Sequence, residues 1–116
     1  MAITASGTAT VQGAIHGCPM VVIYKLSPLT YRLGKPFVKV DTYAMANLIA
    51  RRRLVPELIQ DECTPARVVE ETVAMAEDGT RRAAVIGGLR EVRDRLALPG
   101  ASGRAAEVVL KIARGR

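Results

Sequence analysis

The stretch AITASGTATVQGAIHGCPMVVIY, residues 2–24, combines a short apolar strand, a tight turn, a helix and a second apolar strand. Ser6-Gly7-Thr8 forms the turn, with two hydroxyls and one residue that lacks a Cβ atom. The pattern predicts a helix over residues 10–16, closed by Gly17, and then a buried parallel strand. In such a unit the free backbone N–H groups at the helix start lie at the carboxyl edge of the sheet, where phosphorylated ligands bind. The turn therefore has two interpretations, a phosphate-binding turn or a plain helix cap.

The residues that follow predict another strand and several short helices. Ser27-Pro28 begins a short helix, which ends at Gly34. The apolar segment at residues 37–40 predicts the next strand. Residues 48–60 are expected to form one or two short helices, with a break or a new first turn at Pro56.

Three helices are predicted in the second half of the chain. The first begins at Thr64-Pro65, an N-cap followed by proline, and ends at Gly79. The second covers residues 81–96, where Gly87-Gly88 predicts close packing or a bend. The third is capped by Ser102. Each helix has an apolar stripe at helical spacing. The residues predicted to face inward in the three helices are, in turn, Val69, Val73 and Ala76; Val85, Leu89, Val92 and Leu96; and Ala105, Val108, Val109 and Ile112.

The fold class that follows is α/β, a small parallel sheet flanked by helices with an α-helical C-terminal tail. Strands that are joined through helices run parallel. A parallel sheet this small leaves an edge unpaired and its faces partly bare, and the sequence begins almost on a strand. We therefore expect the chain to be a fragment of a larger domain.

Composition and charge limit the classes of partner. The chain has 116 residues, of which 49% are hydrophobic and only 3% are aromatic, and its formal net charge is +6. The positive charge begins at Lys25 and is densest at Arg51-Arg52-Arg53. A solvated basic surface and attraction to anionic lipid or nucleotide are both compatible with this charge. Nucleic acid is not an expected partner, because stacking aromatic residues and a recognisable reading motif are missing.

Cysteine and histidine do not predict a metal site or a catalytic thiol. Cys18, Cys63 and the single histidine, His16, lack the spacing of zinc ligands. Reduced structural thiols in a cytoplasmic protein are the expectation. His16 is interpreted as a helix-end residue, because no third group is evident to orient it as a base for Cys18.

Residues 5–64 closely resemble the C-terminal, donor-binding half of the lipid-A-disaccharide synthases. The resemblance depends on the order and spacing of several short segments. These are Ala5-Ser6-Gly7-Thr8-Ala9, Pro19-Met20-Val21-Val22, the YKLSPLTY run at residues 24–31, Val38-Lys39-Val40, Asn47-Leu48 and Val55-Pro56-Glu57-Leu58 followed by Gln60. After residue 64 the resemblance is thin.

The resemblance implies an inverting glycosyltransferase of the GT-B architecture, with two facing Rossmann-like domains. Such an enzyme joins a UDP-linked diacylglucosamine donor to a diacylglucosamine 1-phosphate acceptor and releases UDP. It works on the cytoplasmic face of the bacterial inner membrane as a peripheral protein, and neither a metal nor a cofactor is implied. We expect residues 1–63 to be a partial nucleotide-sugar-binding α/β domain and residues 64–116 to be helices packing on it, as one structural unit. The general base is expected in the N-terminal domain, outside this chain.

The same resemblance implies the contacts of the donor. Ser6, Gly7 and Thr8 would lie against the UDP diphosphate and stabilise the charge on the leaving group. Asn47 matches the asparagine of the family's Pro-Asn-Leu segment and would contact the donor, with a turn former before a helix as the alternative. Tyr24 and Gln60 are weaker candidates. Their alternatives are that Tyr24 fills the sheet end and that Gln60 faces water.

Several positions depart from the family pattern. Gln12 stands where the family has a glutamate that accepts hydrogen bonds from the ribose hydroxyls, and the loss of its charge is worth roughly 1–2 kcal/mol of nucleotide binding. Near Asn47, Ala46 replaces a proline, Arg51 a glycine and Arg53 a glutamate. These changes put the orientation of the nucleotide in doubt more than the fold.

Three interpretations of function remain open from the sequence. The first is the donor half of a lipid-A-disaccharide synthase, inactive alone. The second is a non-catalytic binding or oligomerisation module, in which a second copy or another chain covers the open sheet edge, so that a homo-oligomer is possible. The third is a basic membrane-surface protein that uses residues 25–53.

Overall fold

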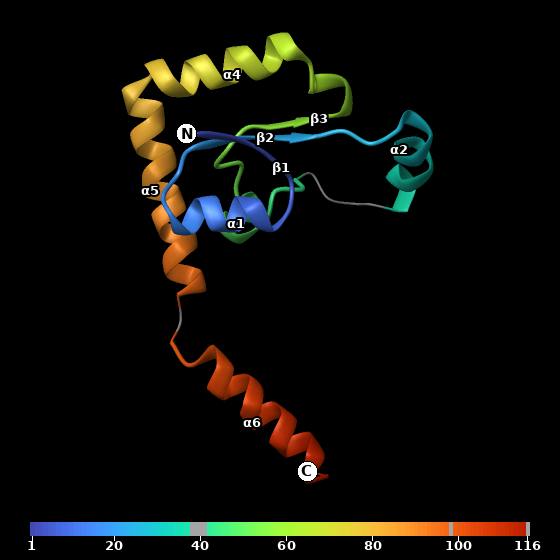
Figure 1. Ribbon diagram of the computed structural model, residues 1–116, viewed down its shortest axis with the longest axis vertical. Coiled ribbons are helices and arrows are strands. Elements are labelled where there is room, and N and C mark those ends of the chain that lie inside the picture. Colours follow the sequence, from blue (N-terminus) through green and yellow to red (C-terminus); the bar gives the residue numbers. More distant parts are fainter. Residues whose placement is uncertain (38–41, 98, 116) are drawn as a thin grey trace.

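A parallel sheet lies at the centre of the computed structural model, which describes residues 1–37, 42–97 and 99–115 (Figure 1). The described strands are β1 (Ala2–Ala5), β2 (Met20–Tyr24) and β3 (Glu57–Ile59), in the order β1-β2-β3. Ile3 pairs with Val21, and Ile23 pairs with Leu58. The α/β fold with a small parallel sheet is confirmed, and β2 is its central strand.

The prediction that residues 54–60 are helical is wrong, because β3 forms there. Pro56 has no N–H group to offer a helix, but its carbonyl oxygen accepts a hydrogen bond from the N–H of Val22 at 2.9 Å. Val55 and Leu58 on either side are buried. Pairing with the edge of β2 therefore satisfies the backbone and buries the apolar side chains at the same time.

The helices around the sheet form two layers. Helix α1 (Thr8–Ile15) joins β1 to β2 and, with α3 (Met45–Ala50), packs against α5 (Gly79–Leu96). Helix α4 (Pro65–Glu77) packs on β2, and Figure 1 shows it on the opposite side of the sheet from α1. The remaining short elements are α2 (Pro28–Gly34) and the 3₁₀ turns η1 (Lys35–Phe37) and η2 (Gln60–Glu62). Phe37 belongs to η1, and residues 38–40 of the predicted strand lie outside the described residues.

Several predicted helix ends are confirmed by capping hydrogen bonds. The Ser27 hydroxyl accepts from the N–H of Thr30 at 3.2 Å, and the Thr64 hydroxyl accepts from the N–H of Arg67 at 3.2 Å. The next boundary differs by one residue from the prediction. Asp78 ends α4 and caps α5, where its carboxylate accepts from the N–H of Arg81 at 3.0 Å. Gly79 therefore begins α5.

The buried stripe of α5 is predicted correctly except at its end. Val85, Leu89 and Val92 are buried in the main core, whereas Leu96 is exposed. Close packing is confirmed at Gly88, since a Cβ atom there would lie 2.1 Å from Cδ1 of Leu54. The Leu54 side chain can lie this close to the backbone of α5 only because Gly88 has no side chain of its own.

The predicted inward faces of α4 and of α6 (Ala101–Ala113) are wrong. In α4 the face on the sheet is turned by about one residue, so that Met75 is buried while Val69, Val73 and Ala76 are exposed. Helix α6 follows Gly100, which adopts φ +85° and takes the N-cap place predicted for Ser102. Figure 1 shows α6 standing apart from the rest of the chain, and no residue of it is buried. Its predicted inward residues, Ala105, Val108, Val109 and Ile112, are therefore exposed.

Candidate functional site

The carboxyl edge of the sheet brings together three segments that the sequence singled out. Because β1, β2 and β3 run parallel, their ends meet at one edge. Ser6-Gly7-Thr8 follows β1, Tyr24 is the last residue of β2, and Gln60 comes directly after β3. Most of the predicted site residues are thus placed along one edge of the molecule.

The turn after β1 is shaped by Gly7. This residue adopts φ +129° and ψ −153°, a conformation that residues with a Cβ atom rarely adopt, and no atom lies within 4 Å of where its Cβ would be. No side chain caps α1, and within the described residues the N–H groups of Thr8 and Ala9 have no hydrogen-bond acceptor. The start of α1 therefore presents free donors and the positive end of the helix dipole to open space.

Ser6 is fixed by a segment that is distant in the sequence. Its hydroxyl donates a hydrogen bond to the backbone carbonyl of Tyr43 at 3.0 Å. The ring of Tyr43 stacks on that of Tyr24, with centroids 5.9 Å apart and planes 17° from parallel. Tyr43 belongs to none of the recognised motifs and was not among the predicted site residues. Tyr24 and Tyr43 together form an aromatic pair next to the turn.

Gln12 lies on the outer side of α1. It is exposed, as is Thr8 one turn earlier, while Thr10 and Ala14 on the opposite side are buried. Residues four apart share a helix face, so Thr8 and Gln12 are neighbours on the surface. A ligand bound at the start of α1 can therefore reach both side chains.

Asn47 is completely buried and makes four hydrogen bonds. Its Oδ1 accepts from the N–H groups of Leu54 at 2.8 Å and Val55 at 2.9 Å. Its Nδ2 donates to the carbonyl of Val55 at 2.9 Å and to Oε1 of Glu57 at 2.7 Å. A direct contact with a donor stays a prediction, and it requires Asn47 to give up one of these bonds.

Gln60 is only 8% exposed, so the alternative that it faces water is wrong. Its side chain holds Leu26 on both sides: Nε2 donates to the carbonyl of Leu26 at 3.2 Å, and Oε1 accepts from the N–H of Leu26. Gln60 itself adopts φ +52°, in the left-handed region. Its role in this structure is to fix the segment that leaves β2.

A basic pocket of about 580 Å³ opens beside Gln60. Three of its lining residues are cationic, Lys25, Arg32 and Lys35, against one acid, Asp61. Lys35 also places its Nζ 5.5 Å from the centre of the Tyr31 ring. The pocket therefore extends the carboxyl edge with positive charge.

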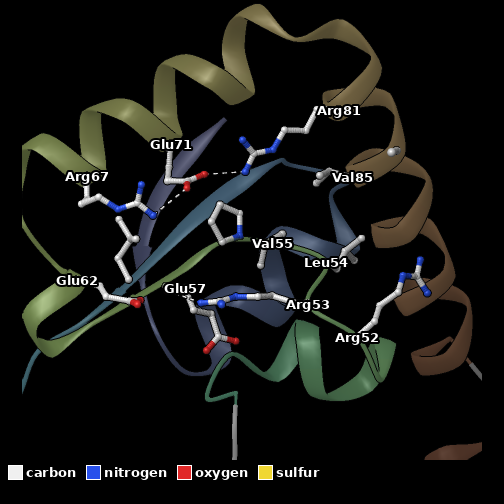
Figure 2. A pocket seen from close by; sticks show the side chains of 13 residues that line it. Arg52, Arg53, Leu54, Val55, Glu57, Glu62, Arg67, Glu71, Arg81 and Val85 are labelled. Carbon is white, nitrogen blue, oxygen red and sulfur yellow. Dashed lines mark hydrogen bonds and ion pairs between the residues drawn. The ribbon is translucent and has the colours of Figure 1, made fainter.

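A second pocket, of about 550 Å³, lies between β3, α4 and α5 (Figure 2). Glu71 accepts hydrogen bonds from Arg67 at 3.3 Å and from Arg81 at 2.7 Å, which links α4 to α5. Hydrogen bonding and charge from Glu70 raise the pKa of Arg67 above its ordinary value. Arg53 donates to the carbonyl of Glu57 at 2.8 Å. Arg81 and Glu71 therefore join α5 to α4 across this pocket. None of the predicted site residues lines it.

The backbone conformation at Arg51 is one that favours glycine. Arg51 ends α3 with φ +57° and ψ 28°, the left-handed conformation that glycine adopts most easily at this position. The glycine expected there from the family pattern fits the same conformation. The substitution therefore keeps the turn and adds strain of roughly 1 kcal/mol.

The described residues contain neither a candidate metal site nor a candidate membrane-spanning helix. Within them, no group of three or more histidine, cysteine, aspartate and glutamate side chains could hold a metal ion. No helix in the same ranges is long and apolar enough to cross a membrane. Cys18 and Cys63 are both free thiols.

Parallel strands, helices on both faces and a glycine turn at the carboxyl edge define a Rossmann-like α/β protein. The model of the lipid-A-disaccharide synthetase family matches residues 1–105, and the chain belongs to this family.

Individual relatives agree with the family match. The chain is 45% identical to the lipid-A-disaccharide synthase of Koribacter versatilis, over 97% of this chain and 31% of that protein. It is 50% identical to that of Acidobacterium capsulatum, over 86% of this chain and 25% of the relative, and 43% identical to that of Geobacter metallireducens, over 94% and 28%. The chain thus spans between about a quarter and a third of the length of these three relatives.

Proposed function

We propose that this chain is the donor-binding part of a glycosyltransferase of lipid A biosynthesis. The complete enzyme would transfer diacylglucosamine from its UDP donor to diacylglucosamine 1-phosphate, forming the lipid A disaccharide and UDP. The observation that carries the proposal is the open turn at Gly7, with the free N–H groups of Thr8 and Ala9 at the carboxyl edge of a parallel sheet. The chain alone is expected to bind UDP weakly and not to form disaccharide, because the acceptor site and general base are expected in the other domain of the family.

The turn has the properties needed to bind a diphosphate. The free N–H groups and the start of α1 attract negative charge, and Thr8 adds an exposed hydroxyl. As the bond between the sugar C1 and the phosphate oxygen breaks, charge grows on the UDP leaving group. Fixed N–H donors stabilise that charge without reorganising, which is catalysis of leaving-group departure without a metal.

The remaining predicted residues surround the turn. Gln12 lies one helical turn beyond Thr8 and is proposed to accept from the ribose hydroxyls. Tyr24, stacked on Tyr43, is proposed to border the donor at the end of β2. Gln60 is proposed to act by holding the segment at Leu26 beside the basic pocket.

We propose that the enzyme works at the cytoplasmic face of the inner membrane and touches it partly through α2. Leu29 and Leu33, one helical turn apart, are 68% and 64% exposed. Lys25, Arg32 and Lys35 lie near them, and such a mixture of apolar and basic side chains suits an anionic lipid surface. The two lipid substrates are held in the same membrane.

A non-catalytic oligomerisation module is the second candidate, and the exposure of α6 favours it. Val108, Val109 and Ile112 are all more than half exposed on this helix. Light scattering that finds a dimer, together with no affinity for UDP, would support this candidate over the first. A chain that binds UDP favours the first candidate whatever its oligomeric state.

Titration calorimetry with UDP tests the proposal. The unaltered chain is expected to bind UDP, and Gly7→Ala to bind it at least about tenfold more weakly, since the alanine Cβ opposes φ +129° at the turn. Gly103→Ala, in the exposed helix α6, is the matched glycine control. The absence of UDP binding to the unaltered, folded chain would overturn the proposal.

A further inference from the structure

Glu57 is an acidic residue buried at the start of β3. It is only 1% exposed, yet its carboxylate accepts three hydrogen bonds. The N–H of Tyr43 donates to Oε2 at 2.9 Å, and the N–H of Ala44 donates to Oε1 at 3.0 Å. Asn47 contributes the third donor, its Nδ2 at 2.7 Å from Oε1. The buried carboxylate is therefore satisfied by residues 43–47, which are the end of a loop and the first turn of α3.

The other hydrogen bonds of Asn47 complete the attachment of this loop. They join it to the backbone of Leu54 and Val55, directly before β3. Glu57 therefore binds the backbone of residues 43–44, and Asn47 binds the backbone directly before β3. The two residues together hold these segments next to each other. Tyr43 and Ala44 have no regular secondary structure, so these side chains determine where their backbone lies.

The same loop supports the turn after β1. The carbonyl of Tyr43 accepts from the Ser6 hydroxyl at 3.0 Å, and the N–H of Ala46 donates to Oγ1 of Thr10 at 3.4 Å. The Thr10 hydroxyl in turn donates to the carbonyl of Gly7 at 2.8 Å. A continuous series of hydrogen bonds therefore runs from the Glu57 carboxylate to Ser6 and Gly7.

We propose that Glu57 is a positioning residue for the anion-binding turn, acting through residues 43–47 and Thr10. The inference rests on the proposed function, since it assigns Glu57 to the binding of the donor diphosphate. Glu57 is too deeply buried to touch a ligand at the surface. It holds the loop that fixes the Ser6 hydroxyl and the Gly7 carbonyl, and so it determines the direction of the free N–H groups at the start of α1.

The test compares Glu57→Gln with a control that weakens the same strand without changing the network. Glutamine keeps the size of the side chain but replaces one acceptor oxygen with an N–H₂ group that faces a backbone donor. Leu58→Ala is the control, because Leu58 is fully buried in β3 and belongs to none of these hydrogen bonds. Thr10→Val is a second test variant of nearly unchanged shape, for use should Glu57→Gln fail to fold.

UDP and inorganic pyrophosphate are the probes, titrated at a temperature at which every variant is folded by circular dichroism. We expect Glu57→Gln and Thr10→Val to bind both probes about tenfold more weakly, and Leu58→Ala to bind within about twofold of the unaltered chain. Amide chemical shifts of Ser6, Gly7 and Thr8 in the ligand-free protein should move in the two test variants and stay in place in the control.

Two different failures can be told apart. Unchanged affinities and unchanged shifts in Glu57→Gln and Thr10→Val would overturn the positioning role while leaving the proposed function intact. Equal losses of affinity in Leu58→Ala would also overturn it, because general stability would then explain the effect. An unaltered chain that binds neither probe would overturn the proposed function, and the positioning role with it.

Discussion

The hydroxyl of Ser6 donates a hydrogen bond to the backbone carbonyl of Tyr43 at 3.0 Å, across 37 positions of sequence. This bond joins the turn after β1 to the loop that leads into α3. A segment that is distant in the sequence therefore helps to fix the geometry of the turn. Affinity for an anion at the turn should therefore depend on residues that never touch the anion.

Ser6→Ala is expected to weaken this connection. Loss of the hydroxyl leaves the Tyr43 carbonyl without its donor and should lower the free energy of unfolding by about 1 kcal/mol. UDP affinity should fall about fivefold, since the turn loses one of its supports. Urea denaturation and calorimetry measure the two effects. Ser102→Ala, on the exposed helix α6, is the control and should change neither quantity.

Gly88→Ala and Gly87→Ala form a matched pair in the middle of α5. A Cβ at Gly88 meets Leu54 at 2.1 Å, whereas a Cβ at Gly87 has no atom within 4 Å. We expect Gly88→Ala to destabilise the protein by about 1–3 kcal/mol through overpacking. Gly87→Ala should stabilise it by up to about 1 kcal/mol through helix propensity. Thermal or urea unfolding of both variants is the measurement, and equal effects of the two would contradict the packing of α5 on Leu54.

Arg51→Gly is expected to stabilise the protein. Arg51 adopts φ +57° at the end of α3, and glycine removes the steric cost of that conformation. The expected gain in the free energy of unfolding is about 1 kcal/mol. Arg90→Gly, at an exposed position inside α5, should instead lose about 1 kcal/mol. A loss of stability in Arg51→Gly would show that the arginine side chain contributes more than its backbone costs.

Gln12→Glu is expected to restore the carboxylate of the family pattern. The residue is exposed on the same face of α1 as Thr8, so the change should leave the stability of the fold nearly unchanged. If Gln12 faces the ribose, the charged acceptor should improve UDP binding by roughly 1–2 kcal/mol, which is about tenfold. Pyrophosphate binding should not improve, since it has no ribose. Equal or weaker binding of UDP by the variant would contradict the role of Gln12.

The N-terminal half was largely predictable because local signals there agree with the tertiary structure. The strand at Met20–Tyr24, the glycine turn and the cap at Ser27 all have clear local patterns in the sequence. The error at β3 has the opposite cause. Glu57–Ile59 is too short to show alternation, and it becomes a strand only because the edge of β2 is free to pair with it.

The hydrogen-bond network around Glu57 could not be predicted from local pattern. An acidic residue is usually solvated, and its partners Tyr43 and Ala44 lie 13 or 14 positions away in an irregular loop. The one signal in the sequence was the position of Glu57 among the apolar residues Val55, Pro56, Leu58 and Ile59. Helix α6 shows a second limit of prediction from sequence. An amphipathic pattern predicts that one face of a helix is buried, but it does not specify what covers that face.

The most direct test of the central claim is an NMR titration of the isotopically labelled chain with UDP. The account predicts that the amide signals of Gly7, Thr8 and Ala9 shift most and that they saturate. In Gly7→Ala, saturation should need at least about tenfold more UDP. Folded protein whose Gly7, Thr8 and Ala9 signals do not respond to UDP would contradict the claim that this turn binds the donor diphosphate.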